Sequence, residues 1–189
     1  MTVPADQPLL AFSGHRLLAR GPAAEVVTVV KTATEAGETV LTFDAVTGRV
    51  VDLDLRGDLA AVLARLTPAT EPEKRGPGRP KLGVTAREVT LLPRHWDWLS
   101  AQPGGASVAL RKLVEGALRE AEGPDRARRA KEATYRFMTA VAGDLPGYEE
   151  ATRMLFAGDW TAFDAAVEGW PEGVRETARG MAAGAWRNG

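Results

Sequence analysis

The stretch that decides the fold lies in the middle of the chain, where residues 87–120 read REVTLLPRHWDWLSAQPGGASVALRKLVEGALRE. Residues 87–92 are rich in β-branched and leucine side chains and predict a strand. A proline at the first position predicts a short helix over 93–102, and the Pro-Gly-Gly sequence of 103–105 predicts a turn. Ser107 is a favourable N-cap for a second helix, which has apolar residues on one side and charged residues on the other. The segment is therefore predicted to be strand, helix, turn, helix.

A segment of this size cannot enclose its own apolar side chains. One strand and two short helices make too small a core, and a lone strand leaves unpaired backbone on both edges. We therefore expect two copies of the chain to associate through this segment. The expected dimer interface consists of Val89, Leu91, Leu92, Trp96, Leu110, Leu113 and Val114.

The Leu92-Pro93 step, the Gly-Gly turn and the helix opened by Ser107 make residues 87–120 resemble the ribbon-helix-helix family of bacterial DNA-binding proteins. The resemblance implies that two chains pair their strands into an antiparallel ribbon, which enters the major groove of DNA. It also implies that backbone amides at the start of the second helix hold a phosphate. The candidate DNA contacts in this segment are Arg87, Thr90, Arg94 and Ser107.

Alternation along the strand leaves two phases open. The family pattern, aligned on Leu92-Pro93, turns Leu92, Thr90 and Glu88 inward and places Leu91, Val89 and Arg87 in the groove. The opposite phase turns Leu91 and Val89 inward. Burial energetics favour the second phase, because an unpaired buried carboxylate is very costly. Thr90 would then face the bases, with Glu88 beside it repelling phosphates.

A basic peptide precedes this segment, at residues 74–81, which read KRGPGRPK. It resembles an AT-hook, in which Gly-Arg-Pro lies along a narrow A·T minor groove and the arginine is inserted. Pro77 stands where the usual hook has its first arginine. The candidate contacts are Lys74, Arg75, Gly78, Arg79, Pro80 and Lys81. The alternative interpretation is a solvated basic linker.

The charge is segregated along the chain. Residues 74–131 carry a formal charge of +7, whereas residues 1–73 and residues 132–189 each carry -4, so that the total is only -1. A basic centre between acidic ends faces either a polyanion or the acidic parts of the same protein.

When the segments on both sides of the central one are included, the predicted fold class is α+β. Residues 1–68 predict a small α/β domain and residues 69–83 a basic Pro/Gly linker. Residues 84–122 form the ribbon-helix-helix-like segment, and residues 125–189 predict a C-terminal region of short helices.

Within the first 68 residues we expect a hairpin of residues 9–12 and 16–19, followed by a helix over 23–36. Strands over 39–43 and 49–55 should be joined by a loop that ends at a glycine, Gly48. A further helix should be capped by Asp58. In the middle of the chain, Gly123-Pro124 should end the second helix of the central segment.

Four motifs together resemble the bacterial family catalogued as domain of unknown function 2239. They are TFDAVTGR at 42–49, GPGRPKLG at 76–83, REVTLLPRHW at 87–96 and GGAS at 104–107. The resemblance would span nearly the whole chain. It implies a bacterial source and no established activity.

The composition of the 189 residues restricts the function further. There is no cysteine, and the two histidines, His15 and His95, lie far apart in the sequence. The chain therefore offers few of the residues that a metal site or a Ser-His-Asp triad requires. No segment approaches the ~20 apolar residues of a membrane span. We therefore expect a cytoplasmic protein without enzymatic activity, cofactor, metal or membrane partner.

The expected function is that of a homodimeric transcriptional regulator or nucleoid-associated protein that binds duplex DNA, with A·T-rich sequence favoured by the hook. The alternative is a non-enzymatic interaction module. In that case the ribbon only dimerises, and the acidic N- or C-terminal regions bind another protein.

Overall fold

The computed structural model describes residues 3–66, 85 and 87–186. The chain divides into two compact units, which we call the first unit (residues 1–70 and 124–189) and the second unit (residues 71–123). The fold is α+β, as predicted, with a three-stranded sheet and seven helices among the described residues. None of these helices combines the length and the apolar character that a bilayer crossing requires. The predicted hook lies outside the described residues.

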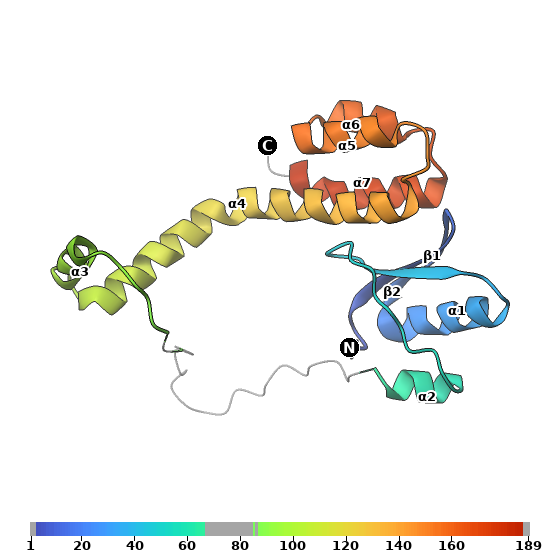
Figure 1. The fold of residues 1–189 in the computed structure, drawn as a ribbon, viewed down its shortest axis with the longest axis horizontal. Helices are drawn as coiled ribbons and strands as arrows, with labels where there is room; N and C mark the ends of the chain where they lie inside the picture. Colours follow the sequence, from blue (N-terminus) through green and yellow to red (C-terminus); the bar gives the residue numbers. More distant parts are fainter. Residues whose placement is uncertain (1–2, 67–84, 86, 187–189) are drawn as a thin grey trace. The chain divides into compact units, whose positions relative to one another are not determined.

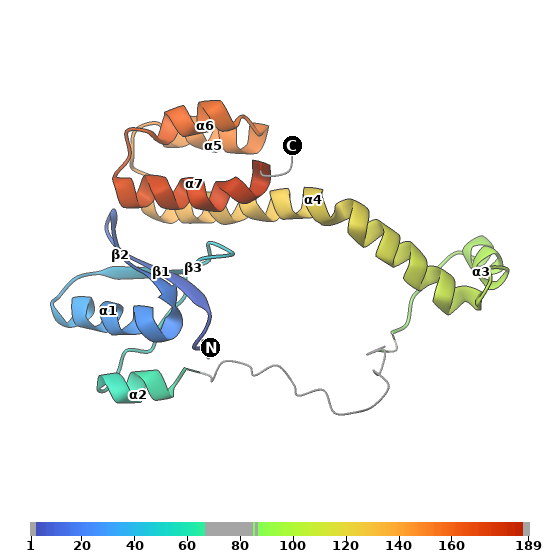
Figure 2. The same ribbon diagram turned by 180° about the vertical axis from the view of Figure 1, so that it is seen from behind.

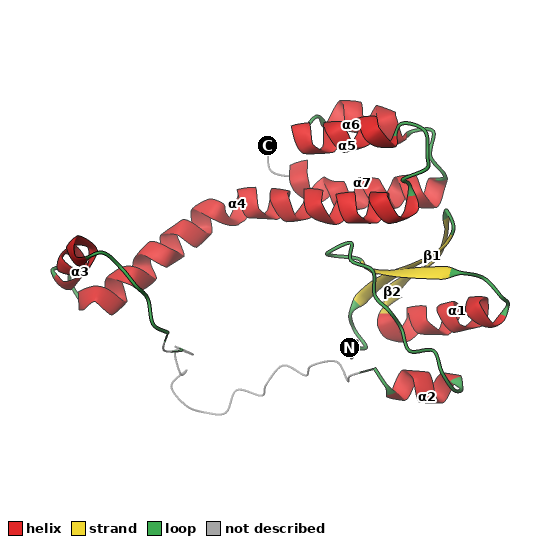
Figure 3. Ribbon diagram, in the orientation of Figure 1, coloured by secondary structure: helices red, strands yellow, loops and turns green. Residues whose placement is uncertain are grey.

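The sheet of the first unit is antiparallel and has the order β2-β1-β3 (Figures 1 and 3). Its strands are β1 (Pro8–Ser13), β2 (Arg16–Pro22) and β3 (Val40–Asp44). The tight turn between β1 and β2 contains Gly14, whose φ of 54° suits glycine. The predicted hairpin is confirmed.

The central strand β1 is buried on both faces, because its alternating side chains enter two different cores. Leu9 and Ala11 pack with α1 (Ala23–Glu35), which covers one face with Val26 and Val30. This confirms the predicted helix over residues 23–36.

The other face of β1 packs on C-terminal helices, so that the sheet lies between two helical layers (Figures 1 and 2). The ring centroids of Phe12 of β1 and Phe43 of β3 lie 5.2 and 5.5 Å from that of Phe137 and 6.4 Å from each other. The helices of this layer are the C-terminal part of α4 (Gly105–Val141), α5 (Tyr148–Ala157), α6 (Trp160–Val167) and α7 (Glu172–Trp186). This core therefore joins the first 44 residues to segments that follow residue 132.

The helix α4 continues through Pro124, so the predicted end at Gly123-Pro124 is wrong. A proline inside a helix removes one hydrogen bond and costs roughly 3 kcal/mol. The turns that follow bury Phe137 and Met138 completely, and burying side chains of this kind stabilises by about 1.5–3 kcal/mol each. The Gly-Pro pair instead coincides with the boundary between the two units.

The predicted strand over residues 49–55 is also wrong. Only Val50 forms a bridge, to Phe43, and the chain then runs on without a neighbouring strand. Half-buried and exposed side chains nevertheless alternate along this stretch, because Val51, Leu53 and Leu55 pack against the core on the α1 side of the sheet. The helix that follows, α2 (Leu59–Ala64), is capped as predicted, with the Ala61 amide donating to Asp58 Oδ1 at 2.8 Å.

Candidate functional site

The second unit has almost no core of its own. It contains α3 (Pro93–Ser100) and the first part of α4. Among its described residues, only Leu99 and Ala109 are buried.

Large apolar side chains of this unit instead face outward. Five of the seven predicted dimer contacts are between 39% and 55% exposed: Val89, Leu92, Trp96, Leu113 and Val114. The other two, Leu91 and Leu110, are half-buried. Trp98 and Leu118 are 52% and 59% exposed and were missed, although Leu118 follows Val114 at helical spacing. We call these nine residues the uncovered apolar face.

A groove of about 370 Å³ runs between the residues before α3, α3 itself and α4. Its lining is largely apolar and includes Leu91, Trp98, Leu99, Leu110 and Leu113. Leu91 thus lines the groove, while Leu92 is 49% exposed and Val89 is 52% exposed. Because residues 87–92 form no strand among the described residues, the choice between the two strand phases stays a prediction.

The predicted strand over residues 87–92 is absent from the single chain. None of the residues that the structure describes forms a backbone hydrogen bond with residues 87–91. A strand needs the backbone of a neighbour, and this stretch has none among the described residues. Residues 87–90 are exposed.

The predicted DNA contacts that the structure describes, Arg87, Thr90, Arg94 and Ser107, are all exposed. Arg94 also lines the groove. Ser107 is not the N-cap, because α4 begins at Gly105 and Ser107 lies within its first turn. The glycine pair itself makes the turn, since Gly104 and Gly105 have φ values of 86° and 74°.

The basic hook contacts Lys74, Arg75, Gly78, Arg79, Pro80 and Lys81 lie outside the described residues. The structure therefore describes four of the ten predicted DNA contacts, and the DNA interface and the hook both remain sequence-based predictions.

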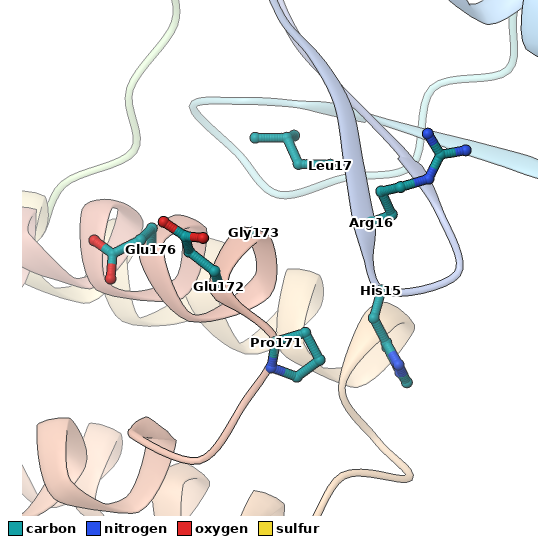
Figure 4. A pocket seen from close by; sticks show the side chains of 7 residues that line it. All are labelled: His15, Arg16, Leu17, Pro171, Glu172, Gly173 and Glu176. Carbon is teal, nitrogen blue, oxygen red and sulfur yellow. The ribbon is translucent and has the colours of Figure 1, made fainter.

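A depression in the first unit lies where the β1–β2 hairpin meets α7 (Figure 4). Its basic side chains already have partners, with Arg16 on Glu38 at 2.6 Å and His15 on Asp144 at 3.3 Å. In Figure 4 the guanidinium group of Arg16 points away from the carboxylates of Glu172 and Glu176. These groups do not converge on a common point, so we interpret the depression as a gap between packed elements and not as a binding site.

Aspartates around the Gly48 turn serve the local backbone. Asp44 Oδ1 accepts hydrogen bonds from the amides of Val46 and Thr47 at 3.0 and 2.6 Å. Asp54 pairs with Arg56, and hydrogen bonds from Arg56 hold the pKa of Asp54 well below its usual range. Across the described part of the chain, no three His, Asp or Glu side chains are grouped as a metal site requires.

These features define a class, an α+β protein in which one unit has a complete core, while the described part of the other exposes an apolar face beside a stretch, residues 87–91, that makes no backbone hydrogen bond with any described residue. The chain belongs to the bacterial family described as "Uncharacterized protein conserved in bacteria (DUF2239)", and the match covers residues 8–182. Comparison with curated proteins and with solved structures gave no match.

Proposed function

We propose that this protein is a homodimeric DNA-binding protein of the bacterial cytoplasm, acting as a transcriptional regulator or a nucleoid-associated protein. The observation that carries the proposal is the uncovered apolar face next to residues 87–91, whose backbone has no hydrogen-bond partner among the residues that the structure describes. A second copy of the chain would satisfy both needs at once.

The dimer argument rests on self-complementarity. In a two-fold interface the same surface lies on both sides, so two unpaired strands can bond to each other and two apolar faces can cover each other. Val114 and Leu118 each expose more than half of their surface, and burying such a remainder stabilises by about 1 kcal/mol per side chain. The resemblance of residues 87–120 to ribbon-helix-helix proteins supports this pairing over a contact with an unrelated protein.

The DNA argument rests on charge. Residues 74–131 hold a formal charge of +7 in a chain whose total is -1. A dimer would bring two such segments together, which favours a polyanion as the partner. Arg87 begins the predicted strand and Arg94 follows it, and the exposed Thr90 is the side chain that we expect to contact bases in the paired ribbon.

Two measurements on the full chain test the proposal. Light scattering should give a dimer mass, and Leu113→Asp should give the monomer mass, because an unpaired charge would enter the interface. The matched control is Leu41→Asp, which places the same charge at a 40% exposed leucine of β3, outside the uncovered apolar face. A monomer mass for the unmodified protein at all concentrations would refute the ribbon.

A gel-shift experiment with A·T-rich and G·C-rich duplexes tests DNA binding. If the hook neutralises ~4 phosphates, the logarithm of the affinity should fall with the logarithm of salt concentration with a slope of about -3.5 from that segment. Replacing Lys74, Arg75, Arg79 and Lys81 by alanine should remove that part of the slope. A dimer without duplex affinity at about 50 mM salt would instead favour the interaction module, whose acidic regions bind another protein.

A further inference from the structure

A second cleft, in the first unit, is basic and has no part in the proposed ribbon. It lies between the loop of residues 45–47, the middle of α4 and the C-terminal half of α7, and its volume is about 350 Å³. Side chains from all three segments line it, and its charged groups are Arg126, Arg129, Arg136 and Glu132.

The loop wall of this cleft is held firmly against α4. Gly48 has a φ of 64°, and a Cβ at this position would lie 2.1 Å from the carbonyl oxygen of Ala133. Arg136 Nη1 donates to the carbonyl oxygen of Thr47 at 3.0 Å. The close approach and this hydrogen bond fix the loop beside the arginines, so the cleft is preorganised.

Positive charge predominates among the lining groups. The one carboxylate, Glu132, is engaged by Arg136 Nη2 at 3.1 Å and by Arg128 Nη1 at 3.9 Å. Arg129 is exposed and forms no hydrogen bond or ion pair with any residue that the structure describes. Its guanidinium group is therefore available to an anion from solution.

A glycine keeps the α7 side of the cleft open. Gly184 is explained by packing, because an added Cβ would lie 3.1 Å from the Cβ of Ala130. Gly180 is different, since an added Cβ would meet nothing within 4 Å. Glycine inside a helix is about 1 kcal/mol less favourable than alanine, and packing gives no reason for it here.

We infer that this cleft binds a phosphate group. Arginine guanidinium groups match phosphate oxygens with paired hydrogen bonds, and a cleft lined on one wall by a glycine admits a group of that size. The phosphate can come from the backbone of DNA or from a small free phosphate compound. The inference does not depend on the ribbon, because it concerns the other unit of the chain.

The test uses the full chain and two kinds of probe. Calorimetric titration with inorganic phosphate and with pyrophosphate measures the free source, and gel shifts with a duplex measure the backbone source. Arg129→Gln should weaken binding of at least one probe about tenfold, and Gly180→Glu should weaken it further by placing a carboxylate in the cleft.

Matched variants separate loss of the site from loss of the fold. Arg153→Gln removes an exposed arginine that pairs with Glu150 outside the cleft, and it should leave binding unchanged. Gly180→Ala should keep most of the binding while raising the melting temperature. Circular dichroism should show that Gly180→Glu remains folded.

The pattern of losses identifies the source. Loss of pyrophosphate or phosphate binding in Arg129→Gln supports a free phosphate compound, and loss of duplex affinity alone supports the DNA backbone. The inference is overturned if no probe binds the unmodified protein, or if Arg129→Gln and Gly180→Glu both bind as it does. The Leu113→Asp monomer keeps the cleft, so failure of the ribbon and failure of the cleft are distinguishable.

Discussion

The two units of this chain differ in the exposure of their large apolar side chains. In the first unit, Phe12, Phe43 and Phe137 are at most 1% exposed and contact one another. In the second unit, Val114 and Leu118 are 55% and 59% exposed. The first unit therefore completes its core within one chain, whereas the second leaves a surface that no described residue covers. Under the proposed function, the first unit supplies stability and the second unit supplies association.

The strongest test of this contrast is a pair of core substitutions. Phe137→Ala should destabilise the first unit by about 3–5 kcal/mol, because it removes a fully buried ring and leaves a cavity. Leu118→Ala should change the unfolding free energy of that unit by less than about 0.5 kcal/mol. Urea unfolding followed by circular dichroism measures both, and equal effects would remove the contrast.

Hydrogen exchange offers the next largest effect. The amides of residues 87–91 have no partner within the described chain, so they should exchange freely in a monomer. In a ribbon dimer they should be protected about 100-fold, and dilution should abolish that protection. The amides of β1 serve as the internal reference, because their protection should not depend on concentration. Unprotected 87–91 amides in a sample shown to be dimeric would mean that the dimer forms without a ribbon.

Substitution of Gly48 should change the stability of the first unit by an intermediate amount. Gly48→Ala combines an unfavourable φ of 64° with a clash against Ala133, and it should destabilise the first unit by about 2 kcal/mol or more. Gly14→Ala is the matched control, since its φ is 54° but nothing lies near an added Cβ. It should cost only the backbone strain, about 1 kcal/mol. Thermal unfolding compares the two, and the reverse order would show that the loop does not press on α4.

The smallest expected effect concerns Asp44 in acid. Burial raises the pKa of Asp44, but hydrogen bonds from Thr47, Gln7 and Val46 outweigh burial and leave the pKa below its ordinary value of 3.8. A carboxyl with a lowered pKa stabilises the fold above pH 3.8, and this contribution disappears as the pH falls through the lower, folded-state pKa. Asp44→Asn should therefore be less stable than the unmodified protein at pH 6, by less than about 1 kcal/mol because the side chain is partly solvated. The gap should narrow below pH 4, and a gap that is constant with pH would assign the effect to shape instead of charge.

Local chemistry made much of the first unit predictable. The Ser13-Gly14 turn, the helix α1 and the cap at Asp58 each depend on a few adjacent residues, and all three were predicted from the sequence. The uncovered apolar face was predictable for the same reason, because helical spacing alone places Leu110, Leu113 and Val114 on one side. The sequence pattern does not identify what covers that face.

Residues distant in sequence decided the rest. Pro124 signals a helix end, but α4 passes through it because Phe137 and Met138 beyond it enter the core under β1. The basic cleft was missed because its walls come from residues 45–47, 126–136 and 180–184, which no local pattern connects. Helix, turn and cap preferences act over a few residues, and the sequence by itself determines them. Which segments lie side by side is set by the burial of side chains far apart along the chain, and that only the tertiary structure decided.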